Sequence, residues 1–160
     1  MPPTEQLNSP NRKHLTRLDR VWVNEPVYLV TICTRGRRPR LIGNGMPALL
    51  VDCLRQAAGA CGWLVGRYVI MPDHVHLFCC PHADAYDLSS FVGRVKSLST
   101  RAAWGLGVWG ALWQREFHDH MLRSSESYAE KCDYVCMSPV RAGLCEAPDQ
   151  WPHAGEVHQI

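Results

Sequence analysis

The sequence lacks the features of a membrane protein, of a secreted disulfide scaffold and of a zinc module. No apolar run approaches the roughly 20 residues that span a bilayer, and the first ten residues are too polar for a signal peptide. The eight cysteines include no C-x-x-C pair, which favours reduced core thiols over disulfides. We therefore expect a cytoplasmic protein with reduced thiols. A metal pair at Cys132 and Cys136, which lie one helical turn apart, is the alternative to reduced thiols at these two positions.

Internal repeats and low-complexity linkers are also absent, so the 160 residues are expected to form one domain with short ends. Hydrophobic residues make up 46% of the chain, which is ample for a buried core. Pro, Asn and charged residues at the start predict a flexible arm over residues 1–16. The domain is then expected over 17–145, followed by a C-terminal coil over 146–160 that packs back onto it.

Positive charge is scarce overall but concentrated near the start of the chain. The net charge is only +2, yet residues 1–40 carry eight Lys and Arg against three acids. Four arginines fall within the six residues 35–40, and guanidinium groups bind phosphate oxygens through paired hydrogen bonds. This cluster indicates an anionic partner, although a solvated basic loop would have the same composition.

The expected elements follow the order strand, helix, strand, strand, helix, strand. Runs of β-forming residues predict the strands, and apolar residues at helical spacing predict the helices. The predicted strands are 27–34, 63–71, 74–80 and 112–122, and the predicted helices are 46–60 and 88–104. This order is typical of an α+β, ferredoxin-like antiparallel sheet. A last helix is expected to follow Ser124 as its N-cap and to end at Pro139.

Two histidines lie one residue apart in the sequence MPDHVH at positions 71–76. On a strand, His74 and His76 share a face, and two imidazoles on one face can bind a divalent metal. Strand histidines that only form hydrogen bonds would show the same spacing. A second pair, His118 and His120, encloses a charged residue, so we expect it on an exposed strand face or in contact with DNA.

Three motifs in this order resemble the HUH single-tyrosine transposases, and the REP-associated tyrosine transposases are the most similar branch. The motifs are MPDHVH at 71–76, WQREFHDH at 113–120, and Asp133-Tyr134 followed by PVRAGL at 139–144. The resemblance implies a metal-dependent single-stranded DNA endonuclease and strand transferase that acts near hairpin repeats through a 5′-phosphotyrosine. It implies His74 and His76 as ligands of Mg²⁺ or Mn²⁺, and Tyr134, on the last helix, as the nucleophile.

The chain departs from the family one helical turn after the tyrosine. Where the family usually has Gln or Asn near the metal, this sequence has Ser138, whose hydroxyl is a shorter and weaker ligand. We expect water to fill the third position and metal binding to be weaker. Decay into a DNA-hairpin-binding module without turnover is the competing interpretation. A small-molecule metalloenzyme would need a third protein ligand, for which the sequence offers no convincing carboxylate.

The resemblance also implies single-stranded or hairpin DNA as the partner. The sequence leaves open whether a monomer or a homodimer binds it, and the lack of a long apolar run predicts that no membrane is involved. Phosphate contacts are expected from basic residues on the first loop and from the second helix, off its apolar stripe. The predicted DNA-binding residues are Arg35, Arg37, Arg38, Arg40, Lys96 and Arg101. The last two equally suit ordinary surface charges.

Overall fold

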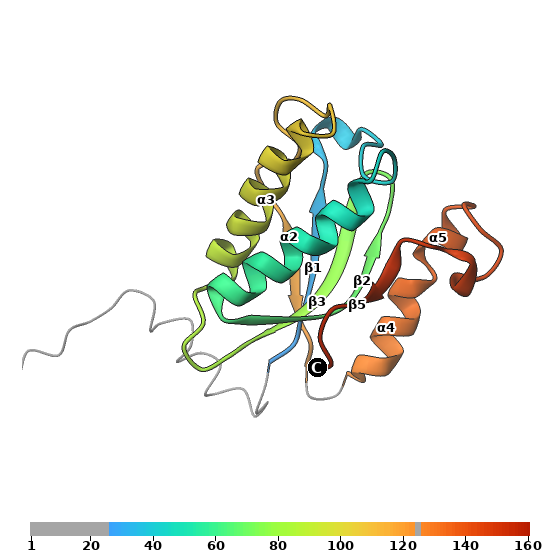
Figure 1. Cartoon of the computed structure of the whole chain (residues 1–160). Coiled ribbons are helices and arrows are strands. Elements are labelled where there is room, and N and C mark those ends of the chain that lie inside the picture. The colour runs from blue at the N-terminus through green and yellow to red at the C-terminus, as the bar shows by residue number, and fades with distance from the viewer. Residues whose placement is uncertain (1–25, 124–125) are drawn as a thin grey trace, which may run out of the picture.

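The computed structural model of the chain describes residues 26–123 and 126–160, and these form an antiparallel sheet with helices on both faces (Figure 1). The five strands lie in the order β4-β1-β3-β2-β5. The strands are β1 (Tyr28–Cys33), β2 (Trp63–Ile70), β3 (His74–Pro81), β4 (His118–Met121) and β5 (Ala154–Glu156). The helices are α2 (Met46–Cys61), α3 (Leu88–Trp104), α4 (Tyr128–Cys136) and α5 (Ser138–Arg141), with 3-10 turns η1 (Arg35–Arg37) and η2 (Pro148–Gln150). The predicted α+β order is confirmed, while the predicted arm at 1–16 lies outside the described residues.

Alternation along β3 separates the main core from the face that carries the histidines. Val75 and Leu77 point toward α2 and α3 and belong to the larger hydrophobic cluster. Phe78 belongs to a second cluster on the opposite face, and His74 and His76 share that face because side chains alternate along a strand. The two histidines are therefore fixed on a strand whose other side is anchored in the core.

Helix α4 docks on the same face of the sheet as the histidines. Its buried residues Cys132 and Val135 join the cluster of Phe78, and the Tyr128 ring meets Phe78 edge-on with centroids 5.2 Å apart. Fully burying such a side chain contributes about 1.5–3 kcal/mol. The helix begins at Tyr128 with Ser127 as its N-cap, later than predicted; Ser124 lies outside the described residues.

The sequence predicted that the last helix ends at Pro139, but in the structure Pro139 lies inside a further short helix. The helix is interrupted at Met137, and Pro139 then occupies the first turn of α5, where its missing N–H is not needed. Tyr134 and Ser138 therefore lie on two consecutive short helices instead of one. This arrangement brings Arg141, at the end of α5, back toward both of them.

The fourth predicted strand is wrong over its first half. Only His118–Met121 pair with β1, and Trp113 forms an isolated bridge with Thr34. Between these two points the backbone carbonyls of residues 114–116 accept hydrogen bonds from Lys96 Nζ, at 2.9 to 3.2 Å. An ammonium group that gathers three carbonyls from one segment removes them from the β-ladder, and the strand is shortened accordingly.

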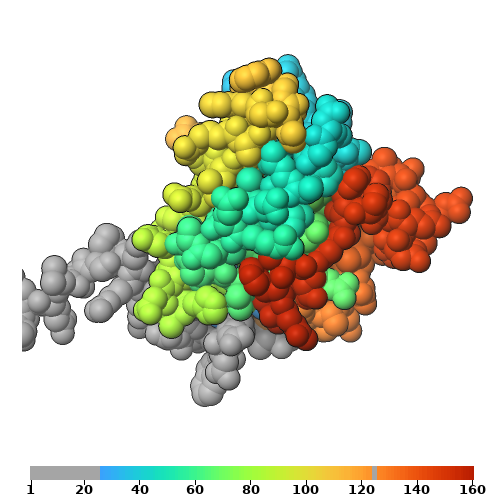
Figure 2. Space-filling view, in the orientation of Figure 1, coloured from blue at the N-terminus to red at the C-terminus, as the bar shows by residue number. Residues whose placement is uncertain are grey.

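Residues 146–160, predicted as coil, contribute η2 and an edge strand. Strand β5 pairs with β2, and the indole N–H of Trp151 donates to the carbonyl of Ile70 at 2.9 Å. Figure 2 shows this C-terminal segment between α2 and the helices α4 and α5. The segment packs back as expected, but backbone pairing along the free edge of β2 makes part of it a strand.

Gly66 in β2 allows two other segments to approach the sheet. A Cβ at this position would lie 2.6 Å from Ile160 Cδ1 and 2.6 Å from the Tyr128 hydroxyl. A side chain at residue 66 would thus push both the C-terminal end and α4 away from β2. Within the described ranges no helix has the length and apolar character required to cross a bilayer.

Candidate active site

The two histidines of β3 present their Nε2 atoms to one another. His74 Nε2 and His76 Nε2 lie 3.1 Å apart, with the rings at 80°. Two ligands at right angles around a metal, each bonded at about 2.1 Å, are separated by about 3.0 Å. The observed spacing therefore fits adjacent positions in the coordination shell of a divalent ion.

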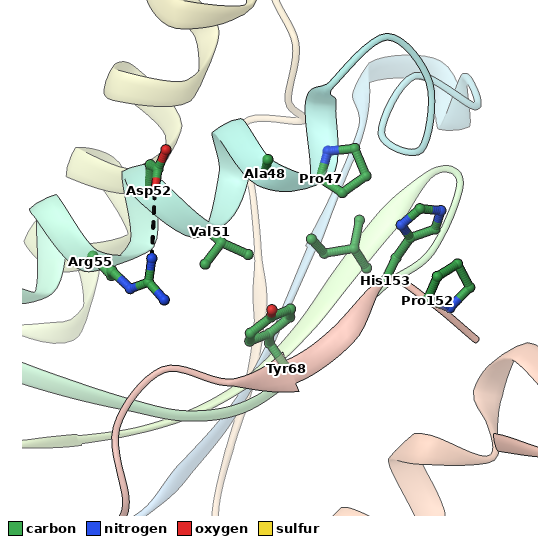
Figure 3. Close-up of a pocket in the computed structure, with 9 residues that line it drawn as sticks. Pro47, Ala48, Val51, Asp52, Arg55, Tyr68, Pro152 and His153 are labelled. Atoms are coloured by element: carbon green, nitrogen blue, oxygen red, sulfur yellow. Dashed lines mark ion pairs between the residues drawn. The ribbon is translucent and has the colours of Figure 1, made fainter. Parts of the chain in front are cut away.

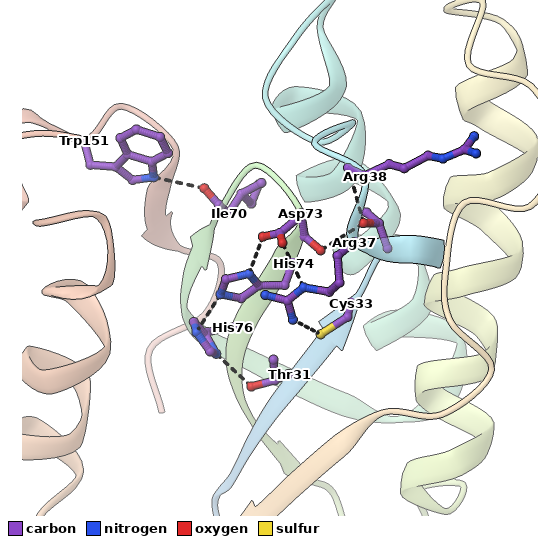
Figure 4. A network of polar contacts seen from close by, with 10 residues as sticks. Thr31, Cys33, Arg37, Arg38, Ile70, Asp73, His74, His76 and Trp151 are labelled. Carbon is purple, nitrogen blue, oxygen red and sulfur yellow. Dashed lines mark hydrogen bonds and ion pairs between the residues drawn. The ribbon is translucent and has the colours of Figure 1, made fainter. Parts of the chain in front are cut away.

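The outer nitrogen of each histidine ring has its own partner (Figure 4). Asp73 Oδ1 lies 2.7 Å from His74 Nδ1, and a carboxylate only accepts, so this bond leaves a lone pair on Nε2. Thr31 Oγ1 lies 2.7 Å from His76 Nδ1 and can donate or accept. Such outer contacts orient the histidines of protein metal sites, so the residues present fit a metal held at the two Nε2 atoms.

Asp73 is in turn held by Arg37. Arg37 Nε donates to Asp73 Oδ2 at 2.8 Å, and its Nη1 approaches Cys33 Sγ at 2.9 Å. Partial burial raises the pKa of Asp73, but hydrogen bonds from His74 and Arg37 outweigh it and lower the pKa. Arg37 has a φ of 55°, a left-handed conformation that is unfavourable for arginine and that these contacts offset.

His76 is neutral at physiological pH. Burial disfavours the imidazolium form, and the positive charges of His74, Arg141 and Arg37 add to this effect, which lowers the pKa of His76 to about 4. A metal binds the neutral ring, so above that pH the extra proton of the imidazolium does not have to be removed before an ion can bind.

Tyr134 lies beside the buried stripe of α4, with 65% of its surface exposed. The Arg141 guanidinium stacks over its ring at 4.2 Å from the centroid and donates to the Tyr134 carbonyl at 2.8 Å. Within the described residues no hydrogen bond or ring contact joins Tyr134 to His74 or His76. Arg141 contacts Tyr134, and its charge also acts on His76.

Ser138 is buried, and its hydroxyl oxygen accepts a hydrogen bond from Arg141 Nη2 at 3.1 Å. No group of three or more His, Cys, Asp or Glu side chains in the described part of the chain is arranged to hold a metal. Cys132 and Cys136 are free thiols, and the alternative metal pair on α4 gains no support. A part for Ser138 at the metal, through water, stays a prediction.

Comparison with known proteins identifies the family of this chain. The family described as "Transposase IS200 like" matches residues 23–127, which is more than half of the chain. The chain belongs to the IS200-like transposase family. This membership makes it a transposase by family, and it confirms the resemblance that the three motifs suggested.

Two relatives narrow the comparison. A REP-associated tyrosine transposase of Escherichia coli (strain K12) is 25% identical over 134 residues, which cover 83% of this chain and 78% of the relative. A solved structure of a REP-associated tyrosine transposase bound to a REP hairpin matches with a TM-score of 0.71 and 23% identity, covering 84% of this chain and 79% of that one. The structural likeness supports the fold of this IS200-like chain.

Two of the basic residues predicted to contact DNA, Arg37 and Lys96, already hold other groups of this transposase. Arg37 is directed at Asp73, and Lys96 holds three backbone carbonyls, with a pKa lowered by burial despite the nearby Glu116. Arg101 donates to Ser97 on its own helix at 2.8 Å and stays exposed. A phosphate that binds Arg37 or Lys96 would therefore have to replace these structural partners.

The second histidine pair serves a different purpose. His118 and His120 are exposed on the edge strand β4, and His120 Nε2 lies 3.0 Å from Glu126 Oε1. Hydrogen bonds from the Arg123 backbone, from Lys131 and from His120 lower the pKa of Glu126 to about 2. His120 thus helps to tie the end of β4 to the start of α4, and the predicted exposure of the pair is confirmed.

Three residues of the site had no role assigned from the sequence. Asp73 immediately precedes His74, so its carboxylate within MPDHVH was a visible signal for an orienting group. Arg141 lies within PVRAGL, but its stacking on Tyr134 depends on the turn between α4 and α5. Thr31 reaches His76 only through the β1–β3 register, which pairs these two residues, and no local pattern reveals it.

A separate hollow of about 410 Å³ lies on the other side of the sheet, between α2 and the segment before β5 (Figure 3). Tyr68 and His153 line it, together with Asp52 and Arg55, whose charged groups pair at 3.5 Å. α2 covers the face opposite the histidines, so this hollow is not part of the candidate active site.

Proposed function

We propose that this IS200-like protein is a metal-dependent single-stranded DNA endonuclease and strand transferase that cleaves near hairpin repeats through a 5′-phosphotyrosine at Tyr134. The observation that supports it most is the convergence of His74 Nε2 and His76 Nε2 at 3.1 Å, on the face where the tyrosine helix docks. Mg²⁺ or Mn²⁺ bound there would supply Lewis-acid charge to a phosphate oxygen.

Tyr134 suits reversible strand transfer. Its phenol oxygen attacks phosphorus and forms the P–O bond of the tyrosyl ester, while the bond to the 3′ oxygen breaks and leaves a 3′-OH. The phenol proton goes to solvent, and the departing 3′ oxygen takes up a proton from solvent to become the 3′-OH. Because a phenolate is a better leaving group than an alkoxide, a 3′-OH can attack the ester and reverse the step.

Arg141 supports this chemistry as a positioning residue. It holds the Tyr134 ring by stacking and the Tyr134 backbone by a hydrogen bond, which limits the freedom of the nucleophile. Its positive charge also acts on His76, so it would stabilise the negative charge of a phosphate bound at the histidines. In catalysis Tyr134 must approach the histidines more closely, within one chain or across a homodimer.

Hairpin DNA is the partner that the relatives favour. One solved relative is bound to a REP hairpin, and the exposed Arg35 and Arg38 provide phosphate donors near η1 on this chain. The test is a denaturing gel of labelled single-stranded hairpins from repeats flanking the gene, incubated with the protein and Mn²⁺. We expect a covalent protein–DNA band that disappears with EDTA.

A DNA-hairpin-binding module without turnover is the second candidate. It is favoured by the hydrogen bond between the Ser138 hydroxyl and Arg141, and by the lack of a hydrogen bond or ring contact between Tyr134 and the histidines within the described residues. Hairpin binding on a native gel without any covalent band in Mn²⁺ would establish this function and exclude the nuclease.

Asp73→Asn is expected to weaken Mn²⁺ binding about 10- to 100-fold. The amide cannot accept from both His74 and Arg37 as the carboxylate does, so the ring of His74 loses its fixed orientation. Titration calorimetry with Mn²⁺ measures the change. Asp84→Asn, at an exposed carboxylate outside the site, is the matched control, and equal affinity of both variants would exclude an orienting role.

Ser138→Asn is expected to tighten Mn²⁺ binding by roughly tenfold, about 1.4 kcal/mol. An amide oxygen reaches farther than the serine hydroxyl and is a ligand type that Mg²⁺ and Mn²⁺ accept. Ser138→Ala should leave the affinity unchanged if water fills the third position. An unchanged affinity for Ser138→Asn would refute the idea that residue 138 faces the metal.

A further inference from the structure

A basic pocket with an exposed indole lies beside η1, the turn whose Arg37 pairs with Asp73 next to the histidines. It has a volume of about 380 Å³ and is lined by Arg35, Arg38, Arg40, Trp109 and the glycines at 36 and 110. η1 and the segment after α3 meet at the same end of the molecule (Figures 1 and 2). Two segments far apart in the sequence thus build one concave surface.

Trp109 is the most exposed large hydrophobic side chain of the described residues, at 70%. The loop that carries it is held in place, because its carbonyl accepts from Arg40 at 3.4 Å and the Gly110 carbonyl accepts from the Trp104 indole at 3.3 Å. An indole displayed on an anchored loop is an accessible flat surface for stacking. Residues 36 and 110 offer space, since a Cβ at either would meet no atom within 4 Å.

The charge around this indole has no acidic partner in the described part of the chain. Within the described residues Arg37 pairs with Asp73, whereas Arg35, Arg38 and Arg40 form no ion pair. Figure 4 shows the side chain of Arg38 pointing away from the histidines, whereas Arg37 points toward Asp73. Guanidinium groups without carboxylate partners, set around an exposed aromatic ring, match a ligand with phosphates and a flat base.

We propose that this pocket binds one unpaired nucleotide of single-stranded DNA, with its base stacked on Trp109 and its flanking phosphates on Arg35, Arg38 and Arg40. A base inside a duplex has both faces covered by its neighbours, so stacking of this kind selects an unpaired position. The proposal rests on the proposed DNA substrate and adds a feature to it. It places a single-stranded nucleotide beside η1, the turn whose Arg37 holds Asp73 and, through it, His74.

The test compares two labelled hairpins in EDTA, one blunt and one with a short single-stranded extension, by fluorescence anisotropy with the full chain. Base stacking on an aromatic side chain contributes about 1–3 kcal/mol, so Trp109→Leu should weaken binding of the extended hairpin about 5- to 150-fold. Binding of the blunt hairpin should change less than about twofold. Trp109→Phe should retain most of the affinity, and Tyr86→Leu, at another exposed aromatic residue, should have no effect.

Abasic nucleotides in the extension make the test specific for stacking. Removing the base that contacts Trp109 should weaken binding to the wild type as much as Trp109→Leu does, and the two changes together should cost no more than either alone. Equal binding of the extended hairpin by wild type and Trp109→Leu, or equal weakening of both hairpins, would overturn the proposal.

The result is separable from the test of the nuclease. A covalent band from wild-type protein combined with no effect of Trp109→Leu would reject the pocket and keep the nuclease. Selective loss of extended-hairpin binding without any covalent band would keep the pocket and reject the nuclease. An RNA extension bound in the same Trp109-dependent way as DNA would overturn the assignment to DNA.

Discussion

Tyr134→Phe is expected to abolish the covalent protein–DNA band and to lower cleavage by on the order of 10³-fold or more. The substitution removes only the phenol oxygen, which is the atom proposed to bond to phosphorus. Hairpin binding should persist, because the ring is largely exposed and a phenyl ring keeps the stacking surface for Arg141. A denaturing gel and a native gel of the same samples separate the two effects.

Two other tyrosines serve as controls for this substitution. Tyr86→Phe removes another exposed phenol and should leave the covalent band intact. Tyr128 lies in the same helix as Tyr134, but burial raises the pKa of its hydroxyl, so it is a poorer nucleophile at neutral pH. A covalent band that survives in Tyr134→Phe and disappears in Tyr128→Phe would show that Tyr128, and not Tyr134, is the nucleophile.

Replacing both His74 and His76 by alanine is expected to reduce Mn²⁺ affinity at least about 100-fold and to stop cleavage, since the loss exceeds that of an outer-shell change. Both Nε2 atoms that converge at 3.1 Å are removed, and no group of three or more His, Cys, Asp or Glu side chains among the described residues is arranged to replace them. Titration calorimetry measures the affinity, and the gel measures cleavage with the same preparation.

His118→Ala is the matched control for the double substitution, because it removes a ring from the second HxH pair on an exposed strand. It should bind Mn²⁺ as the wild type does. Unchanged Mn²⁺ affinity in the double variant, or cleavage by the wild type that resists EDTA, would exclude a metal at His74 and His76.

Much of the fold follows from local sequence patterns. The helix predicted over 88–104 has these bounds in the structure, and the first three predicted strands agree within one residue or two at their ends. Apolar spacing and β-forming runs suffice there because each element buries one clear face. The position of the two histidines on one strand face follows from the same alternation and from nothing more distant.

The errors occur where long-range contacts override local propensity. Lys96 draws residues 114–116 out of the predicted fourth strand, and no local pattern signals an ammonium group from another element. The C-terminal segment becomes partly β-strand because β2 has a free edge, which is visible only once the sheet is assembled. The same limit applies to Trp109, whose partners at 35–40 come from a distant loop.

The sequence motifs named the candidate residues of the site but not most of the groups that hold them. Motifs pointed to His74, His76 and Tyr134, whereas their partners Thr31 and Arg141 required the strand register and the turn after α4. The same turn directs the Ser138 hydroxyl to Arg141, a contact that spacing along one continuous helix did not suggest.

Mass spectrometry of the trapped complex tests the nucleophile assignment most directly. Wild-type protein is incubated with hairpin DNA and Mn²⁺, digested with nuclease and protease, and the peptide that carries the nucleotide is sequenced. We expect one nucleotide joined through its 5′-phosphate to Tyr134. A nucleotide on any other residue, or one joined through a 3′-phosphate, would contradict a 5′-phosphotyrosine intermediate at this position.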